Sequence, residues 1–334
     1  MSQTRKILVA SFSPLPESFI KGLFAPYASE VPGELEVVVL YDKPREEIIR
    51  VLGEADIVIG DYTFKMKIDS EMCYAMKKAK LLQQPSTGYD HIDIEACREA
   101  GVPVANAGGA NAVSVAEYTV MAALILLKRI VEAHERTTKG EWPQWELMQK
   151  GTFDLESKVW GIIGLGRIGR EVARRVRVFG ARILYYDIRR LGEEEEKDLG
   201  VEYRSLPRLL RESDIVSIHV PLTDKTRHMI GERELRAMKP TAILINPSRG
   251  EIVDEEALAR ALSEGWIMGA AVDVYSQEPP PPNHPLLRLR NVNLLLTPHI
   301  AGANTDARAR IIEFSIKNVV NVLKGGKPQA VVNM

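Results

Sequence analysis

Short runs of apolar, often β-branched residues alternate with amphipathic stretches along almost the whole chain. This alternation predicts βαβ units and parallel sheets, because a helix after each buried strand returns the chain to the same edge of the sheet. Helices are expected at Arg45–Gly53 and Asp69–Lys78. The strands expected in the first third are Lys6–Ser11, Glu36–Leu40, Asp56–Ile59, Leu81–Gln83 and Pro103–Val104.

A second series of the same kind begins at Lys158. The last amphipathic stretch, Asp306–Leu323, predicts a helix that no strand follows in sequence. One arrangement open to it is to pack back onto the first series, which would make that domain discontinuous. The strands expected in the second series are Val159–Ile163, Arg182–Tyr186, Asp214–Val220, Ala242–Asn246, Gly269–Val274 and Asn293–Leu296.

A long helix is expected between the two series. A loop of small residues precedes it, and Ser114 and Glu117 have the spacing of a capping box, in which each side chain binds a free backbone N–H at the helix start. The helix is expected to fade near Lys139. Charged residues interrupt its apolar run, so the pattern indicates a buried or interfacial helix rather than a membrane span.

Composition narrows the class of protein. The 334 residues are enough for two hydrophobic cores, and a net charge of -1 gives no reason to expect nucleic acid or an anionic membrane as partner. Cys73 and Cys97 cannot form a disulfide framework and suit a reducing compartment. The first residues read as a strand and not as a signal peptide, so a cytoplasmic location is expected.

Three glycines carry the clearest motif. Gly164, Gly166 and Gly169 have G-x-G-x-x-G spacing after a predicted strand and at the start of a predicted helix. The first glycine permits a tight turn, the second leaves room for a pyrophosphate, and the third lets helix and strand pack closely. Free N–H groups at the helix start favour the phosphates. The motif alone is weak, but its context predicts a dinucleotide site.

Asp187 ends the next predicted strand. An acidic side chain there accepts hydrogen bonds from the ribose hydroxyls and repels a 2′-phosphate, which favours NAD over NADP. Arg189 and Arg190 weaken that preference, since either could pair with a phosphate. Without the glycine motif, Asp187 could equally be an ordinary turn residue.

Three segments of the last third each hold a chemically useful residue. Arg249 follows a strand end, where ligands bind in open α/β sheets, and a guanidinium can bind a carboxylate through two hydrogen bonds. Asp273 lies at the end of an apolar strand, and either the nicotinamide amide or a backbone N–H could be its partner. His299 follows another strand, and beside Glu278 it becomes a plausible general acid.

Alternatives to these roles are also open. Arg249 could be a surface arginine, Glu278 an exposed side chain before a proline-rich loop, and His299 a structural or solvated histidine. Reduction of a 2-keto acid needs a group for the carboxylate and a proton donor for the oxygen, and these residues supply both. No lysine–tyrosine pair, metal-ligand cluster, nucleophile elbow or Walker pattern competes with them in the sequence.

The ordered set GLGRIG, HVPLT, NPSRG, AVDVYSQEP and TPHIAG resembles the D-isomer-specific 2-hydroxyacid dehydrogenase family, over nearly the whole chain. The resemblance implies two flavodoxin-like or Rossmann-like domains with parallel sheets and an active site in the cleft between them. It implies a substrate-binding (catalytic) domain at 1–108 and 302–334, and an NAD-binding Rossmann domain at 109–301.

The resemblance also implies residue roles. Glu278 and His299 would form the acid/base dyad, Arg249 would bind substrate, and the backbone at Thr87 and Gly88 would hold the substrate carboxylate. No metal is implied. Beyond the glycine motif, the cofactor contacts implied are Arg167, Ile168, Asp187, Val220, Pro221, Ser248, Asp273 and Gly302.

The expected activity is interconversion of a small 2-keto acid and its D-2-hydroxy acid, with glyoxylate or hydroxypyruvate as the favoured type and a phosphoglycerate-type substrate open. NAD is the expected cofactor and a homodimer the expected assembly. Two other functions stay open, an NAD(H)-sensing binding protein and oxidation of an inorganic or one-carbon acid such as phosphonate. Formate dehydrogenases, which resemble the family, carry Gln where this chain has Glu278.

Overall fold

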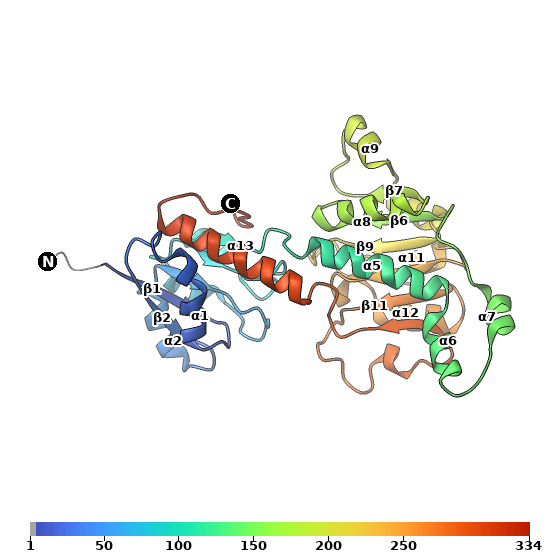
Figure 1. The fold of residues 1–334 in the computed structure, drawn as a ribbon, viewed down its shortest axis with the longest axis horizontal. Helices are drawn as coiled ribbons and strands as arrows, with labels where there is room; N and C mark the ends of the chain where they lie inside the picture. The colour runs from blue at the N-terminus through green and yellow to red at the C-terminus, as the bar shows by residue number, and fades with distance from the viewer. Residues whose placement is uncertain (1–4) are drawn as a thin grey trace. The chain divides into compact units, whose positions relative to one another are not determined.

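Two parallel sheets organise residues 5–334, the part of the chain that the computed structural model describes (Figure 1). One unit comprises the residues up to Asn111 together with Thr305–Met334, and the other comprises Ala112–Asn304. The α/β class with two parallel-sheet domains, predicted from the alternating pattern, is therefore confirmed. The chain crosses between units a few residues after each boundary that the sequence suggested.

The first unit contains a five-stranded sheet in the order β2-β1-β3-β4-β5. This order is that of flavodoxin-like folds. All strands are parallel, and the direction of winding reverses between β1 and β3. The strands are β1 (Lys6–Ser11), β2 (Glu34–Val39), β3 (Ile57–Ile59), β4 (Leu82–Gln83) and β5 (Val104–Ala105). The helices are α1 (Glu17–Leu23), η1 (Ala25–Tyr27), α2 (Arg45–Leu52), α3 (Ser70–Ala75), α4 (Ile94–Glu99) and α13 (Thr305–Leu323).

Alternate residues of this sheet face two layers of helices. Val9 and Ile57 pack with α1 and α13, whereas Ala10 and Val58 pack with α2, α3 and α4. The C-terminal segment is tied to the sheet by buried amides, since Asn318 Nδ2 donates to Gln83 Oε1 at 2.7 Å. The last helix of the chain thus completes the core of the first unit.

The second unit contains a seven-stranded sheet in the order β12-β11-β10-β9-β6-β7-β8. The direction of winding reverses between β6 and β9, as in dinucleotide-binding folds. The strands are β6 (Val159–Ile163), β7 (Arg182–Tyr186), β8 (Val201–Tyr203), β9 (Ile215–Ile218), β10 (Ile243–Asn246), β11 (Gly269–Val272) and β12 (Asn293–Leu296).

Helices cover both faces of this sheet, and its residues alternate between them. Ile243 and Ile245 face a core shared with α5 and α8, whereas Leu244 faces a core shared with α10, α11 and α12. The helices are α5 (Ala112–Leu127), α6 (Ile130–Thr137), α7 (Gln144–Gly151), α8 (Arg167–Val178), α9 (Glu193–Leu199), α10 (Leu206–Glu212), α11 (Glu232–Ala237), η2 (Gly250–Ile252), α12 (Glu255–Ser263) and η3 (Pro285–Arg288).

The prediction for the long helix was wrong in two respects. Helix α5 begins at Ala112, so Ser114 is its third residue and is buried, and Glu117 pairs with Arg175 instead of closing a capping box. Arg129 has a φ of 50°, which ends the first helix before α6 begins. Its guanidinium binds the carbonyl oxygens of residues 150 and 151, so a tertiary contact stabilises the break.

Cys73 and Cys97 are both buried and both free thiols. They lie on α3 and α4 of the first unit. Within residues 5–334, no helix combines the length and the apolar character that crossing a membrane requires.

Candidate active site

The turn after β6 can be built only with glycine at its first position. Gly164 has a φ of 92°, a backbone conformation that side chains disfavour. A Cβ there would also lie 2.7 Å from the carbonyl oxygen of His219, which follows β9. The turn therefore lies where the winding of the sheet reverses, the position at which doubly wound folds bind their ligands.

The other two glycines differ in what surrounds them. A Cβ on Gly169 would overlap the carbonyl oxygen of Gly164, so this glycine permits the contact between helix and turn. A Cβ on Gly166 would meet no atom within 4 Å. Arg167 and Ile168 are the first two residues of α8, whose N-terminal N–H groups follow this open position. The residues present thus fit a pyrophosphate, because open space adjoins free N–H donors.

Asp187 lies beside the glycine turn. Its Oδ2 accepts a hydrogen bond from the backbone N–H of Leu165 at 2.7 Å, and its Oδ1 accepts one from Arg189 N at 3.1 Å. The carboxylate is held by both segments and stays partly exposed. An acidic group is therefore fixed next to the turn, as the spacing in the sequence suggested.

Three neighbouring strands end at the same level. Asn246 of β10 pairs with Val272 of β11, which pairs in turn with Leu296 of β12. The segments that leave these ends carry Arg249, Glu278 and His299 respectively. The parallel sheet thus places the three predicted catalytic residues at one edge of the second unit.

His299 and Glu278 form a direct pair. The Nδ1 atom of His299 lies 2.7 Å from Glu278 Oε2, and Glu278 Oε1 accepts the backbone N–H of Tyr275 at 3.0 Å. Both side chains of the pair are more than a third exposed. Partial burial acts to raise the pKa of Glu278, but the hydrogen bond and charge of His299, with the charge of Arg249, outweigh it and the pKa is lowered. The carboxylate is consequently ionised near pH 7.

Asp273 holds the segment that carries His299. Its Oδ1 accepts hydrogen bonds from the Thr297 hydroxyl at 2.6 Å and the Ile300 N–H at 2.9 Å, and its Oδ2 accepts the Ala301 N–H at 2.8 Å. The sequence left a backbone N–H open as one partner of Asp273, and the structure shows two such partners. Burial raises the pKa of Asp273, and these three donors oppose that effect.

Arg249 is positioned by its own loop. Its Nη1 donates to the carbonyl oxygen of Ser248 at 2.7 Å, and its carbonyl oxygen accepts Asn246 Nδ2 at 2.9 Å. A Cβ on Gly250 would overlap the backbone of Tyr275, so this glycine lets the loop after β10 pack against the loop after β11. Close approach of the two loops brings the charge of Arg249 near Glu278.

The remaining predicted residues fall in two places. Val220 and Pro221 follow β9, and Gly302 follows the His299 segment. Ser248 lies against the end of β9, because its Oγ donates to the carbonyl oxygen of Ile218 at 2.6 Å. These residues lie in the second unit, whereas Thr87 and Gly88 follow β4 in the first. Thr87 Oγ1 donates to Asn111 Oδ1 at 2.7 Å, and Gly88 O accepts Ser86 Oγ.

Two other histidines could compete with His299 as the acid. Burial lowers the pKa of His219 to about 3, so its ring is neutral near pH 7. His284 lies 3.1 Å from Glu255, but both side chains are almost fully buried. Exposure therefore separates the His299–Glu278 pair from a similar pair in the core.

Sequence reasoning missed the outer support of this site. The Tyr118 hydroxyl lies 2.6 Å from Thr297 Oγ1, and Thr297 in turn donates to Asp273. Tyr118 is 179 residues from Thr297 in the sequence. The one sequence signal for its role is that it is a polar side chain on the apolar helix α5. In the first unit, Ser13 Oγ and Gln84 Oε1 are buried near the strand ends with no hydrogen-bond partner among the described residues.

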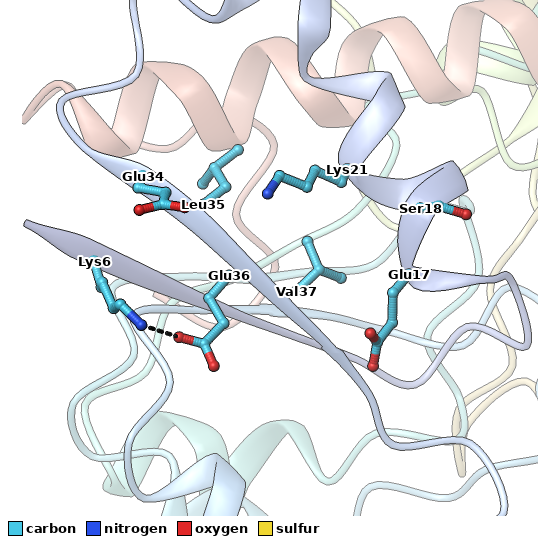
Figure 2. Close-up of a pocket in the computed structure, with 8 residues that line it drawn as sticks. All are labelled: Lys6, Glu17, Ser18, Lys21, Glu34, Leu35, Glu36 and Val37. Carbon is cyan, nitrogen blue, oxygen red and sulfur yellow. Dashed lines mark ion pairs between the residues drawn. The ribbon is translucent and has the colours of Figure 1, made fainter.

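A surface hollow lies elsewhere in the first unit, between α1 and the edge strand β2 (Figure 2). Lysine and glutamate side chains line it, and Lys6 pairs with Glu36 at 3.6 Å across one end. It contains none of the predicted site residues. In the described part of the chain, no three His, Cys, Asp or Glu residues are grouped to hold a metal ion.

The strand order and the glycine turn define a dinucleotide-binding domain of the dehydrogenase type. The family model described as D-isomer specific 2-hydroxyacid dehydrogenase, NAD binding domain, matches residues 120–301. The chain belongs to this family, and it is a 2-hydroxyacid dehydrogenase that uses a nicotinamide cofactor.

Relatives agree with this assignment along most of the chain. A glyoxylate reductase of Korarchaeum cryptofilum is 41% identical over 99% of this chain and 94% of its own. One of Thermofilum pendens is 46% identical over 86% of this chain and 84% of its own. The crystal structure of a glyoxylate reductase from Paecilomyes thermophila covers 99% of both chains with a TM-score of 0.84 at 27% identity.

Two glycine substitutions should affect different properties, one the binding of the cofactor and the other the stability of the fold. Gly166→Ala adds a methyl group in open space, so the thermal midpoint should change little while the dissociation constant for NADH rises at least about tenfold. Gly169→Ala forces its Cβ onto the turn, which should cost about 1–3 kcal/mol of stability. Calorimetry and NADH fluorescence titration would measure both. Equal destabilisation by the two variants would contradict this account of the motif.

Glu278 should stabilise the fold in a pH-dependent way. Its pKa is lower in the folded protein than in the unfolded chain, so its contribution is present above the unfolded value of about 4.3 and disappears as pH falls through the folded value. Glu278→Gln should therefore lower the thermal midpoint at pH 7, and the difference from the parent should vanish in strong acid.

The matched control for this pH series is Glu256→Gln, which changes an exposed glutamate on α12. Circular dichroism melts between pH 3 and pH 8 would follow all three proteins. A Glu278→Gln deficit that persists or grows at the acid end would show that lost packing, and not lost charge, is responsible.

Proposed function

We propose that this chain reduces a small 2-keto acid to its D-2-hydroxy acid, with His299 and Glu278 as the acid/base dyad and Arg249 as the substrate-binding residue. The observation that carries the proposal is the 2.7 Å pair between His299 Nδ1 and Glu278 Oε2, partly exposed at the strand ends. Such a pair is what a proton donor requires, because the carboxylate orients the ring and stabilises its charged form.

The proton step follows from the ring geometry. Nδ1 of His299 faces Glu278, which leaves Nε2 for the substrate oxygen. A bound nicotinamide cofactor supplies or accepts the hydride. In reduction, hydride addition at the carbonyl carbon moves the π electrons onto oxygen, which then takes the proton from Nε2. In oxidation, the neutral ring accepts that proton, and Glu278 stabilises the imidazolium formed.

Arg249 suits the other end of the substrate. Its guanidinium can hold a carboxylate oxygen and polarise the neighbouring carbonyl through parallel hydrogen bonds. Its loop is fixed by Asn246 and by contact with the Tyr275 segment. The role predicted for the backbone at Thr87 and Gly88, in the first unit, stays a prediction.

NAD is the cofactor that we propose, over NADP. Asp187 is a fixed carboxylate beside the glycine turn, where it would accept ribose hydroxyls and repel a 2′-phosphate. Gly166 and the start of α8 would hold the pyrophosphate. The other predicted contacts, Val220, Pro221, Ser248, Asp273 and Gly302, border the same edge; of these, Asp273 has backbone and hydroxyl partners already.

Glyoxylate or hydroxypyruvate is the substrate type that we propose. The support is the name glyoxylate reductase borne by relatives 41% and 46% identical to this chain. Arg249 at the proposed site is compatible with this substrate type, because a guanidinium can bind the carboxylate of a small 2-keto acid. The cytoplasmic location expected from the sequence stays a prediction.

His299→Gln should lower kcat by roughly 10²–10⁴-fold, because it removes the proton donor, and should leave NADH binding intact. NADH oxidation at 340 nm with glyoxylate, hydroxypyruvate, pyruvate and phosphohydroxypyruvate would measure this and rank the substrates. His134→Gln, an exposed histidine on α6, is the control. Parent protein that binds NADH but reduces none of these acids would defeat the proposal, as would a fully active His299→Gln variant.

We also propose that the chain forms a homodimer through the region of α5 to α7. Large apolar side chains are exposed there, with Trp142 81% and Trp145 66% accessible. Exposed apolar groups of this size are typical of protein interfaces. Sedimentation velocity should show a species of twice the 37.3 kDa chain mass, and Trp145→Glu should convert it to monomer. A parent protein that sediments as a monomer at micromolar concentration would refute the assignment.

A further inference from the structure

Arg190 is a cation placed where a phosphate-bearing cofactor would attract it. It lies three residues beyond Asp187, in the loop that leaves β7, and its side chain is 60% exposed. A guanidinium near the adenosine ribose is the usual partner of the 2′-phosphate of NADP. An unengaged guanidinium at this position would therefore work against the preference for NAD that Asp187 favours.

A carboxylate from α9 occupies this guanidinium. Arg190 Nε lies 3.1 Å from Glu196 Oε1, and Arg190 Nη2 lies 3.4 Å from Glu196 Oε2. The two donors thus face the two oxygens of one carboxylate, the paired geometry in which arginine also binds phosphate. The charge and the donors on this side of Arg190 are already engaged within the protein.

The glutamate is the fixed member of this pair. The Glu196 side chain is only 14% exposed, and its Oε1 also accepts the hydroxyl of Tyr185 at 2.8 Å. The same hydroxyl accepts the backbone N–H of Leu191 at 2.8 Å, so α9 and the loop after β7 meet at one fully buried ring. The hydrogen bond from Arg190, with that of Tyr185, lowers the pKa of Glu196 against the effect of burial, which keeps the carboxylate ionised near pH 7.

An aromatic face completes the arrangement. The guanidinium carbon of Arg190 lies 5.4 Å from the centre of the Tyr203 ring on β8, within the range of a cation–π contact. The Tyr203 ring packs edge-on against Tyr185 at 5.5 Å. Arg190 is therefore held against α9 and β8 by an ion pair and a ring together.

We infer that Glu196 is a specificity-determining residue, which neutralises Arg190 and holds it against Tyr203 so that it does not bind a 2′-phosphate. The inference rests on the proposed NAD preference, and it assigns that preference to two carboxylates. Asp187 repels the phosphate directly, and Glu196 engages Arg190, one of the two neighbouring arginines that could otherwise attract it.

The test is Glu196→Gln, which keeps the shape of the side chain and removes its charge. The ratio of kcat/KM for NADPH to that for NADH should rise about tenfold, the scale of one charge-assisted contact, while the value for NADH stays within about twofold. Calorimetric titration gives a readout independent of turnover. Adenosine 2′,5′-bisphosphate should bind about tenfold more tightly to the variant, and adenosine 5′-monophosphate should bind as before.

Three matched variants test the cause. Glu195→Gln removes the same charge from the neighbouring position, where Glu195 pairs with Arg170, and it should leave the ratio unchanged. The double variant Glu196→Gln/Arg190→Gln should lose the gain. Arg190→Gln alone should leave binding of the bisphosphate unchanged, since Arg190 is already engaged, and this measurement serves even if Glu196→Gln folds poorly.

Each contrary result has a definite meaning. An unchanged ratio in folded Glu196→Gln, an equal gain in Glu195→Gln, or weaker bisphosphate binding in Arg190→Gln alone would overturn the inference. A parent enzyme that prefers NADPH would also overturn it and would leave 2-keto acid reduction standing. A parent protein that reduces no acid with either cofactor would instead remove the proposed function.

Discussion

The edge that carries the proposed dyad depends on one buried carboxylate. Asp273 accepts hydrogen bonds from Thr297, Ile300 and Ala301, and its carbonyl oxygen accepts the backbone N–H of His299 at 2.7 Å. His299 has a φ of 55°, a conformation that costs energy for a residue with a side chain and persists only where the surroundings hold it. The hydrogen bonds of Asp273 provide those surroundings, so the direction of the imidazole depends on a group that need not touch substrate.

The parallel sheet supplies the second constraint. Strands β10, β11 and β12 are in register at their carboxyl ends, so residues far apart in sequence leave the sheet at one level. Gly250 and Gly164 then let neighbouring loops approach more closely than any side chain would allow. Without these contacts, Arg249 would not lie near Glu278, and the glycine turn would not lie against the end of β9. Sheet geometry and two close backbone approaches together bring the residues of the candidate site to one edge of the sheet.

Chemically similar groups of this chain differ in their partners and in their exposure. His284 with Glu255 and His299 with Glu278 are both imidazole–carboxylate pairs, but only the second is open to solvent. Arg190, in the loop after β7, is engaged by Glu196 and Tyr203. Residue type and position after a strand therefore do not by themselves define a role, because the neighbouring side chains set the exposure and the pairing of each group.

The α/β class, most strands, the glycine turn and the position of Arg249, Glu278 and His299 after strand ends could be predicted from the sequence, because hydrophobic period and short motifs are local properties. The sequence placed the start of α5 wrongly at Ser114, since a buried position and a pairing with α8 override the local capping signal. The side-chain partners at the site could be identified only once the elements were packed together. The Tyr118–Thr297 contact spans 179 residues, the strand β8 is three residues long, and the neutralisation of Arg190 depends on how α9 packs against β7. Contacts of this kind leave no periodic trace in the sequence, because they arise where the fold brings separate elements together.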